Sequence, residues 1–305
     1  MNRGPRLIER IVKNKALFPI ALIISISAWV LSPYSWVVAL MYCLMPLLLW
    51  GFERHFSLFR NKSQLHLTLF VLMSILVPSL HTDVTGSIVM VLTTFSIFIL
   101  FESYQQRDAV LSLHFIGILL GIGTLIDPRT SLFVLVVWFV AYQVQAIRLK
   151  GFISSLLGMI LPIILWLAYL FVNRILPQFP VLFSQYKDQY IPQIPLFSWT
   201  QWTVLGLIII LIITATAYLL KHSHYDKLRT ATYMNLIAGT SFFLFVCILF
   251  FENWWTLLMP SLYALTSILV GHYFSNQKGK LSGLALMVVL LLMVTLGAYE
   301  VMVLK

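Results

Sequence analysis

Apolar residues dominate the chain in long runs that follow one another with short polar segments between them. A helix needs about 20 apolar residues to cross the hydrocarbon core of a bilayer, with a range of about 17–25. The pattern therefore predicts transmembrane helices along nearly the whole chain. The runs cover residues 16–31, 36–51, 66–82, 86–103, 109–126, 130–147, 152–173, 200–220, 232–251, 254–273 and 282–301.

Together the runs predict an all-α fold, a polytopic transmembrane helical bundle of about 11 spans that forms a single domain over residues 1–305. The runs 16–31 and 36–51 are short, and an alternative is that they form a re-entrant hairpin, which would leave nine spans. Because a hairpin returns the chain to the side from which it entered, the orientation of the later spans is the same in both interpretations.

Composition supports the bilayer as the main partner of this chain. Hydrophobic residues make up 60% of the sequence and charged residues only 10%, whereas soluble proteins carry about 25% charged residues. The two cysteines, Cys43 and Cys247, lie in apolar runs far apart in sequence, which favours buried side chains over a disulfide framework.

The distribution of Lys and Arg predicts the orientation. Short cytoplasmic loops of membrane proteins are enriched in these residues. With the N-terminus inside, sixteen of the 20 basic residues fall in cytoplasmic segments and four outside. We therefore expect the N-terminus in the cytoplasm, the C-terminus outside and a location in the bacterial cytoplasmic (inner) membrane. The net charge of +10 then reflects topology and lipid contact, not nucleic acid. The four outer basic residues are Arg129, Arg174, Lys187 and Lys305.

The longest gap between runs, 174–199, contains four prolines among aromatic residues. Proline prevents one continuous helix, and aromatic residues gather at the water–lipid boundary. This outer segment is expected either to contact a substrate as a lid or to serve as an interfacial connector.

No Asp, Glu, Lys or Arg lies in the middle of a run. Ion-coupled carriers, proton pumps and voltage sensors depend on charges at such positions, so these classes are disfavoured. Gly117, Gly121 and Gly123 form a face of small residues that predicts close helix packing. Pro46, Pro162 and Pro260 interrupt three spans.

The candidate chemistry lies in three short outer turns that carry Asp83, Asp127 and Glu252. A carboxylate there could act as a general base or hold a divalent metal. Arg129, two residues after Asp127, could bind a lipid phosphate through bidentate hydrogen bonds. If the three turns surround one cavity, these groups would meet at the outer interface.

The alternative interpretation is that these acids cap helices. Asp127 precedes Pro128, which is the order of an N-cap and a first helical residue. Asp83 stands before run 86–103 and Asn253 before run 254–273, where both could cap a helix start. No metal site and no cofactor are predicted, since nucleotide-binding and zinc motifs are not found in the sequence.

Two resemblances follow from the segment Gly117-Ile-Leu-Leu-Gly121-Ile-Gly123-Thr-Leu-Ile-Asp127-Pro-Arg129 and the basic turn after the next run. The chain resembles an uncharacterised family of integral membrane proteins from Bacteroidota. Members of this family carry segments similar to Gly158 to Pro162 and Leu258 to Pro260. That resemblance implies a polytopic membrane protein over most of the chain.

The same segment resembles the span end that leads into an outer turn in GT-C membrane glycosyltransferases. The resemblance implies binding of a polyprenyl-phosphate-linked intermediate at the outer face. GT-C enzymes usually carry a long first outer loop with a catalytic acid, whereas the loop here is about Ser32–Ser35 and contains no acid.

The leading functional hypothesis is an inner-membrane envelope protein that binds a lipid-linked intermediate, with Arg129 on the phosphate and Asp127, Asp83 or Glu252 as polar partners or catalytic acids. A second is a non-catalytic subunit that packs against a membrane protein partner through the Gly117–Gly123 face. A third is an uncoupled transporter or flippase.

Overall fold

All secondary-structure elements in the described part of the chain are helices, as predicted, because a helix satisfies its backbone hydrogen bonds internally in lipid. These residues form two compact units, which we describe separately. Unit 1 comprises residues 1–87, 196–245 and 262–305, and unit 2 comprises 88–195 and 246–261. The computed structural model describes residues 7–12, 14, 16–59, 63–106, 109–146, 148–174, 196–222, 227–277 and 279–303.

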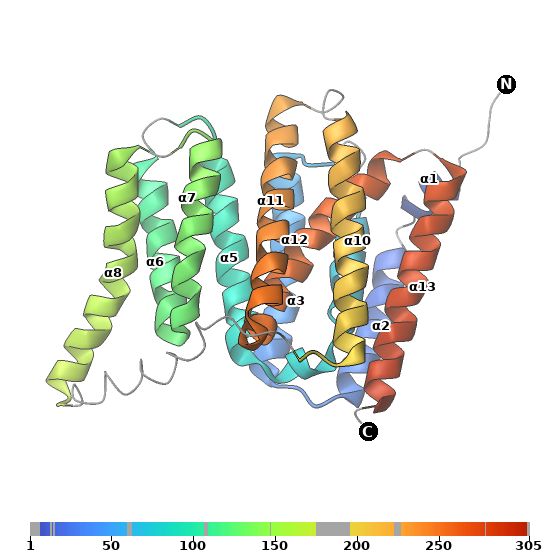
Figure 1. The fold of residues 1–305 in the computed structure, drawn as a ribbon, viewed down its shortest axis with the longest axis horizontal. Coiled ribbons are helices and arrows are strands. Elements are labelled where there is room, and N and C mark those ends of the chain that lie inside the picture. Colours follow the sequence, from blue (N-terminus) through green and yellow to red (C-terminus); the bar gives the residue numbers. More distant parts are fainter. Residues whose placement is uncertain are drawn as a thin grey trace. The chain divides into compact units, whose positions relative to one another are not determined.

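Within these residues, seven helices are long and apolar enough to cross a membrane, which supports the prediction of a multi-pass membrane protein (Figure 1). They are α3 (Trp36–Phe56), α5 (Val84–Glu102), α8 (Leu149–Val172), α10 (Trp199–His222), α11 (Leu228–Phe250), α12 (Trp255–Asn276) and α13 (Lys280–Val303). The shorter α-helices are α1 (Leu7–Val12), α2 (Leu17–Leu31), α4 (Leu65–Met73), α6 (Val110–Ile126) and α7 (Phe133–Gln143). The count of eleven spans stays a prediction.

In two predicted runs the α-helix is shortened by a 3-10 helix that starts at a proline. Run 66–82 consists of α4, a turn and η1 (Pro78–Thr82), and run 130–147 consists of the end of η2 (Pro128–Leu132) and then α7. Proline has no N–H and restricts the preceding residue to extended conformations. Asp127, with φ −148° and ψ 115°, has such a conformation.

In unit 1 the buried side chain of His81 joins the break after α4 to the turn between α2 and α3. Its Nε2 donates to the Ser74 carbonyl oxygen at 2.9 Å, so its Nδ1 accepts from the Ser32 hydroxyl at 2.8 Å. The ring also stacks on Trp29 at a centroid distance of 3.8 Å. The first short turn, Ser32–Ser35, is further fixed by a hydrogen bond from Ser35 N to the His81 carbonyl oxygen.

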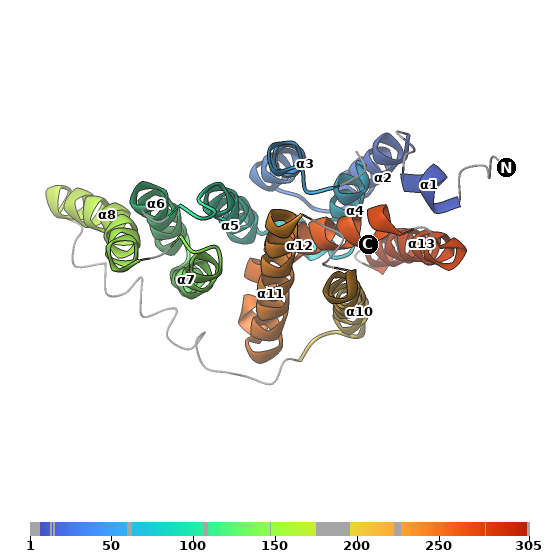
Figure 2. The ribbon, with the colours of Figure 1, turned by 90° about the horizontal axis from the view of Figure 1, so that it is seen from above.

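In unit 2, α6 lies directly against α8 (Figure 2). A Cβ atom on Gly117 would collide with the Ser155 carbonyl oxygen, and one on Gly121 with the Met159 carbonyl oxygen. Gly158 of α8 meets the His114 carbonyl oxygen in the same way. The predicted close packing of this glycine face therefore takes place inside the chain, and the face is covered by α8.

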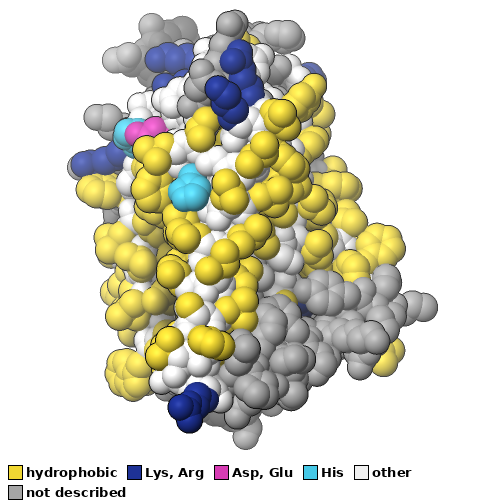
Figure 3. Space-filling view, turned by 90° about the vertical axis from the view of Figure 1, so that its left-hand side faces the viewer, with side chains coloured by type: hydrophobic (Ala, Val, Ile, Leu, Met, Phe, Trp, Pro, Cys, Tyr) yellow, Lys and Arg dark blue, Asp and Glu magenta, His cyan; other side chains and the backbone are white. Residues whose placement is uncertain are grey.

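The face drawn in Figure 3 is apolar between charged ends. Figure 3 shows hydrophobic side chains over the face formed by α6 and α8, with Lys and Arg side chains toward its ends. In the most apolar stretch of α8 and of α13 only 22% of the residues are buried, compared with 94% in α12. Helices α8 and α13 thus present wide faces to lipid, and α12 is enclosed by protein.

Two predictions are not tested by this fold. Most of the outer segment 174–199 lies outside the described residues, which end at Arg174 and resume at Leu196. The prediction of a single domain over 1–305 also stays a prediction.

Candidate functional site in the turn between α6 and α7

The turn between α6 and α7 is organised by Asp127. Its Oδ1 accepts a hydrogen bond from the main-chain N–H of Arg129 at 2.9 Å, and Pro128 is the first residue of η2. The Asp127 carbonyl oxygen accepts from the Thr130 N–H at 3.0 Å and from the Thr130 hydroxyl at 2.7 Å. Asp127 therefore caps η2, as the capping interpretation of the sequence predicted.

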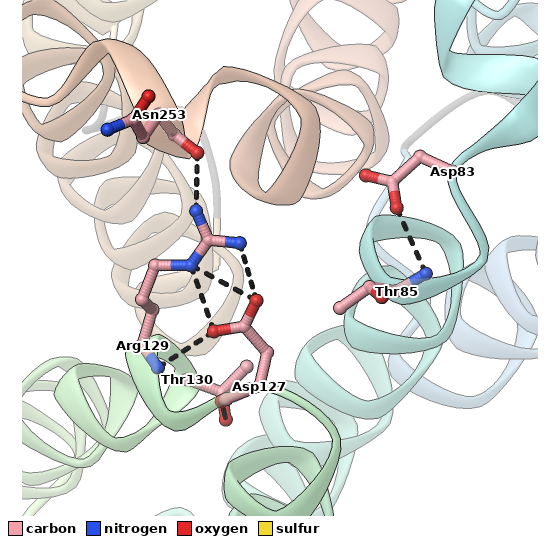
Figure 4. Close-up of polar contacts among 6 residues, drawn as sticks. All are labelled: Asp83, Thr85, Asp127, Arg129, Thr130 and Asn253. Atoms are coloured by element: carbon pink, nitrogen blue, oxygen red, sulfur yellow. Dashed lines mark hydrogen bonds and ion pairs between the residues drawn. The ribbon is translucent and has the colours of Figure 1, made fainter. Parts of the chain in front are cut away.

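The same carboxylate binds the Arg129 side chain (Figure 4). Nε donates to Oδ1 at 2.9 Å and to Oδ2 at 3.1 Å, and Nη2 donates to Oδ2. The Asp127 side chain is 2% exposed and that of Arg129 11%. Both carboxylate oxygens thus accept strong hydrogen bonds in a site that is largely closed to water. In this state Asp127 is a partner for Arg129 and is not placed to act as a general base.

Arg129 also connects two turns of unit 2. Its Nη1 donates to the carbonyl oxygen of Asn253, in η6 (Glu252–Trp254) between α11 and α12. A guanidinium has five N–H donors. The hydrogen bonds drawn in Figure 4 use the Nε–H, one N–H of Nη1 and one N–H of Nη2. The two other N–H groups of the guanidinium have no partner among the described residues.

The other predicted site residues are placed as follows. Glu252 begins η6, next to the Asn253 carbonyl that Arg129 binds, and its side chain lies outside the described residues. Asp83 belongs to unit 1, where its Oδ1 accepts from the Thr85 N–H at 3.1 Å at the start of α5. Asp83 therefore caps α5, as the alternative interpretation predicted. A cavity shared by all three turns stays a prediction.

Two residues of functional interest were not found by the sequence reasoning. Asn253 contributes a main-chain carbonyl, which any residue could supply, so no side-chain pattern indicates it. His81 is fully buried, and the signal in the sequence was a histidine that follows Pro78 near the end of an apolar run.

Comparison of the chain with protein families, with curated proteins and with solved structures found no match. The fold and the turn between α6 and α7 define a class only, a multi-pass α-helical membrane protein with a buried Asp–Arg pair in that turn.

Proposed function

We propose that this chain is an inner-membrane protein of the bacterial envelope that binds the phosphate of a lipid-linked intermediate at its outer face. In this proposal the N-terminus is cytoplasmic, the C-terminus is outside, and the bundle has eleven spans. The separation of sixteen basic residues from four along the predicted topology supports this orientation. In this orientation the Asp127–Arg129 turn would lie at the outer interface, where polyprenyl phosphates present their head groups.

The observation that carries the proposal is the state of the Arg129 guanidinium. It is nine-tenths buried, held by Asp127 and by the Asn253 carbonyl, and keeps two N–H donors that no described residue binds. A planar guanidinium fixed in this way is pre-organised for the tetrahedral oxygens of a phosphate. Three of its N–H groups are bonded within the chain and orient the side chain, and the remaining two would bind the ligand.

Asp127 has a positioning role in this proposal. Its charge is opposite to that of Arg129, so it weakens the attraction of the guanidinium for a phosphate while it fixes the geometry. Binding that can be reversed suits a protein that holds an intermediate and passes it on. The proposal is one of binding, without a catalytic step.

Lipid mass spectrometry on gently purified protein tests the proposal. Wild type is compared with Arg129→Lys, which keeps the charge and loses the planar fork, and with Arg174→Ala, which removes another predicted outer base from the exposed end of α8. We expect a polyprenyl phosphate or sugar-linked lipid with wild type and Arg174→Ala, and its loss in Arg129→Lys. The same bulk phospholipids in all three preparations would refute the proposal. Gel filtration profiles show whether each variant is folded.

A further inference from the structure

Asp127 occupies one edge of the Arg129 guanidinium. Nε donates to Oδ1 at 2.9 Å and to Oδ2 at 3.1 Å, and Nη2 donates to Oδ2. An arginine can grip a phosphate along this edge with two parallel hydrogen bonds, and here the carboxylate has taken that place. The N–H groups that no described residue binds are one on Nη1 and one on Nη2, since Nη1 gives its other N–H to the Asn253 carbonyl. The side chain therefore offers a ligand two donors.

The two turns that Arg129 joins carry more acid than base. The first, residues 127–132, contains Asp127 and Arg129, and the second, residues 252–254, contains Glu252. One base against two acids gives these turns a formal charge of −1. Because the repulsion from a fixed negative charge grows with the charge of the ligand, such a site disfavours a multiply charged anion more than a singly charged one.

Burial and fixed geometry strengthen this effect. The Asp127 side chain is 2% exposed and that of Arg129 11%, so water screens their charges poorly. The carboxylate also accepts from the Arg129 main-chain N–H at 2.9 Å, as Figure 4 shows, and it cannot turn away from a ligand without breaking the cap of η2. A phosphate oxygen that enters without a donor would lose its hydrogen bonds to water and gain none.

Among phosphate head groups, the phosphodiester matches two donors. A phosphate monoester has three acceptor oxygens and a charge of about −1.5 to −2 at pH 7. A second ester bond takes up one of these oxygens and leaves two, which share a single negative charge. A diphosphate has more charge and more oxygens than a phosphodiester. Only the phosphodiester thus has as many charged oxygens as the Arg129 side chain has remaining donors.

We infer that this site selects a lipid phosphodiester over phosphate monoesters and diphosphates, and that Asp127 sets the preference. The inference rests on the proposed function, since it assumes that Arg129 binds a phosphate, and it adds the class of head group. A phosphodiester arises where one phosphate joins a lipid to its cargo, for example a sugar. The lipid without cargo is a monoester and binds more weakly. The protein would therefore retain the loaded lipid and release the bare carrier.

The test compares three head groups on one chain, with farnesyl methyl phosphate, farnesyl phosphate and farnesyl diphosphate as probes. Each is titrated into full-length protein freed of lipid in a neutral detergent, and the shift of the thermal unfolding midpoint gives an apparent Kd. In wild type we expect the diester to bind about tenfold more tightly than the other two, because of the charge of Asp127. Arg129→Lys should lose this binding.

The outcomes separate this inference from the proposed function. Equal binding of the three probes, or tighter binding of the diphosphate, that is lost in Arg129→Lys would overturn the preference and leave the phosphate site in place. Binding of none of the probes, or binding unchanged in Arg129→Lys, would refute the phosphate site itself.

A glycerophospholipid distinguishes the source of the phosphodiester. Short-chain phosphatidylglycerol is a singly charged phosphodiester without a prenyl chain. Weaker binding of phosphatidylglycerol than of farnesyl methyl phosphate would support a lipid-linked intermediate as the ligand. Equal binding would uphold the phosphodiester preference and contradict the lipid-linked intermediate.

The variant Asp127→Asn tests the origin of the preference, because asparagine keeps Oδ1 as an acceptor and removes the charge. The ratio of the Kd for the monoester to the Kd for the diester should fall about fivefold or more, since the more highly charged ligand gains more. Glu300→Gln is the control, since it removes one acid from a partly exposed position of α13 in unit 1. An unchanged ratio in folded Asp127→Asn would contradict the role of Asp127. If that variant does not fold, the preference of wild type among the three head groups decides.

Discussion

Arg129 and Asp127 form a buried ion pair although they are only two positions apart in the sequence. The Arg129 Nε donates to both carboxylate oxygens, at 2.9 and 3.1 Å, and its main-chain N–H donates to Oδ1 at 2.9 Å. The carboxylate therefore fixes both the backbone and the side chain of Arg129. Through the Asn253 carbonyl, the same side chain holds the turn before α12 against the turn before α7.

This pair should be necessary for the stability of unit 2. Removing one partner of a buried ion pair leaves an uncompensated charge and typically costs about 3–5 kcal/mol. Asp127→Asn should lower the free energy of unfolding in lipid-free detergent by about 3 kcal/mol by that estimate. Equilibrium unfolding measured by circular dichroism provides the value. The double variant Asp127→Asn/Arg129→Gln should recover part of the loss, and equal losses in the single and double variants would contradict the charge argument.

The α6–α8 contact should not tolerate a methyl group. Gly121→Ala places a Cβ against the Met159 carbonyl oxygen, which belongs to backbone and cannot move alone. Overpacking of this kind costs about 1–3 kcal/mol. Gly206→Ala in α10 is the control, since its Cβ would meet no atom within 4 Å. Thermal unfolding should show a lower midpoint for Gly121→Ala only, and equal midpoints for both variants would show that the two helices are not in contact.

The hydrogen bond between Ser32 and His81 should stabilise unit 1. Ser32→Ala removes the donor to the buried Nδ1 and should cost about 1–3 kcal/mol, since that nitrogen is then left without a partner. Ser27→Ala serves as the control because Ser27 is exposed and bonds only the Ile24 carbonyl of its own helix. Chemical denaturation of both variants measures the difference. A Ser32→Ala variant as stable as Ser27→Ala would show that the hydrogen bond between Ser32 and His81 does not stabilise unit 1.

Cysteine labelling tests the topology of unit 2. In a background with Cys43→Ala and Cys247→Ala, single cysteines replace Gln106, before α6, and Arg174, after α8; both native side chains are exposed. Three crossings between them place these positions on opposite sides. An impermeant maleimide added to intact spheroplasts should label Arg174→Cys, and Gln106→Cys only after lysis. Labelling of both from outside would mean that η2 and α7 do not cross, and would reduce the span count.

The hydrophobic pattern was sufficient to predict the fold class, because long apolar runs have only helical solutions in lipid. The pattern was less informative about whether each run forms one unbroken helix. Run 66–82 looked like one span, but Pro78 follows a break in which His81 binds the Ser74 carbonyl oxygen. The break depends on the side chain of His81, which lies eleven residues after Phe70 of α4. A hydropathy pattern does not report such a contact.

The candidate site was predictable where the interactions are local. Asp127, Pro128 and Arg129 are adjacent, so the capping geometry could be inferred from their order. The bond from Arg129 to Asn253 joins residues 124 positions apart and ends on a main-chain oxygen, so no residue pattern indicates it.

The amount of lipid retained by Asp127→Asn tests most directly the claim that Arg129 binds the phosphate of a lipid-linked intermediate. Phosphate binding by Arg129 predicts that the variant retains more lipid than wild type, whereas a purely structural ion pair predicts no increase. Asparagine keeps Oδ1 as an acceptor for the main-chain N–H and the Nε of Arg129, so the side chain stays oriented, while the guanidinium has its full charge available for a phosphate. Purified from membranes in parallel with wild type, Asp127→Asn should carry more polyprenyl phosphate or sugar-linked lipid per protein, measured by mass spectrometry. An equal or smaller amount in a folded Asp127→Asn protein would show that the pair only stabilises the turn, and would contradict the account.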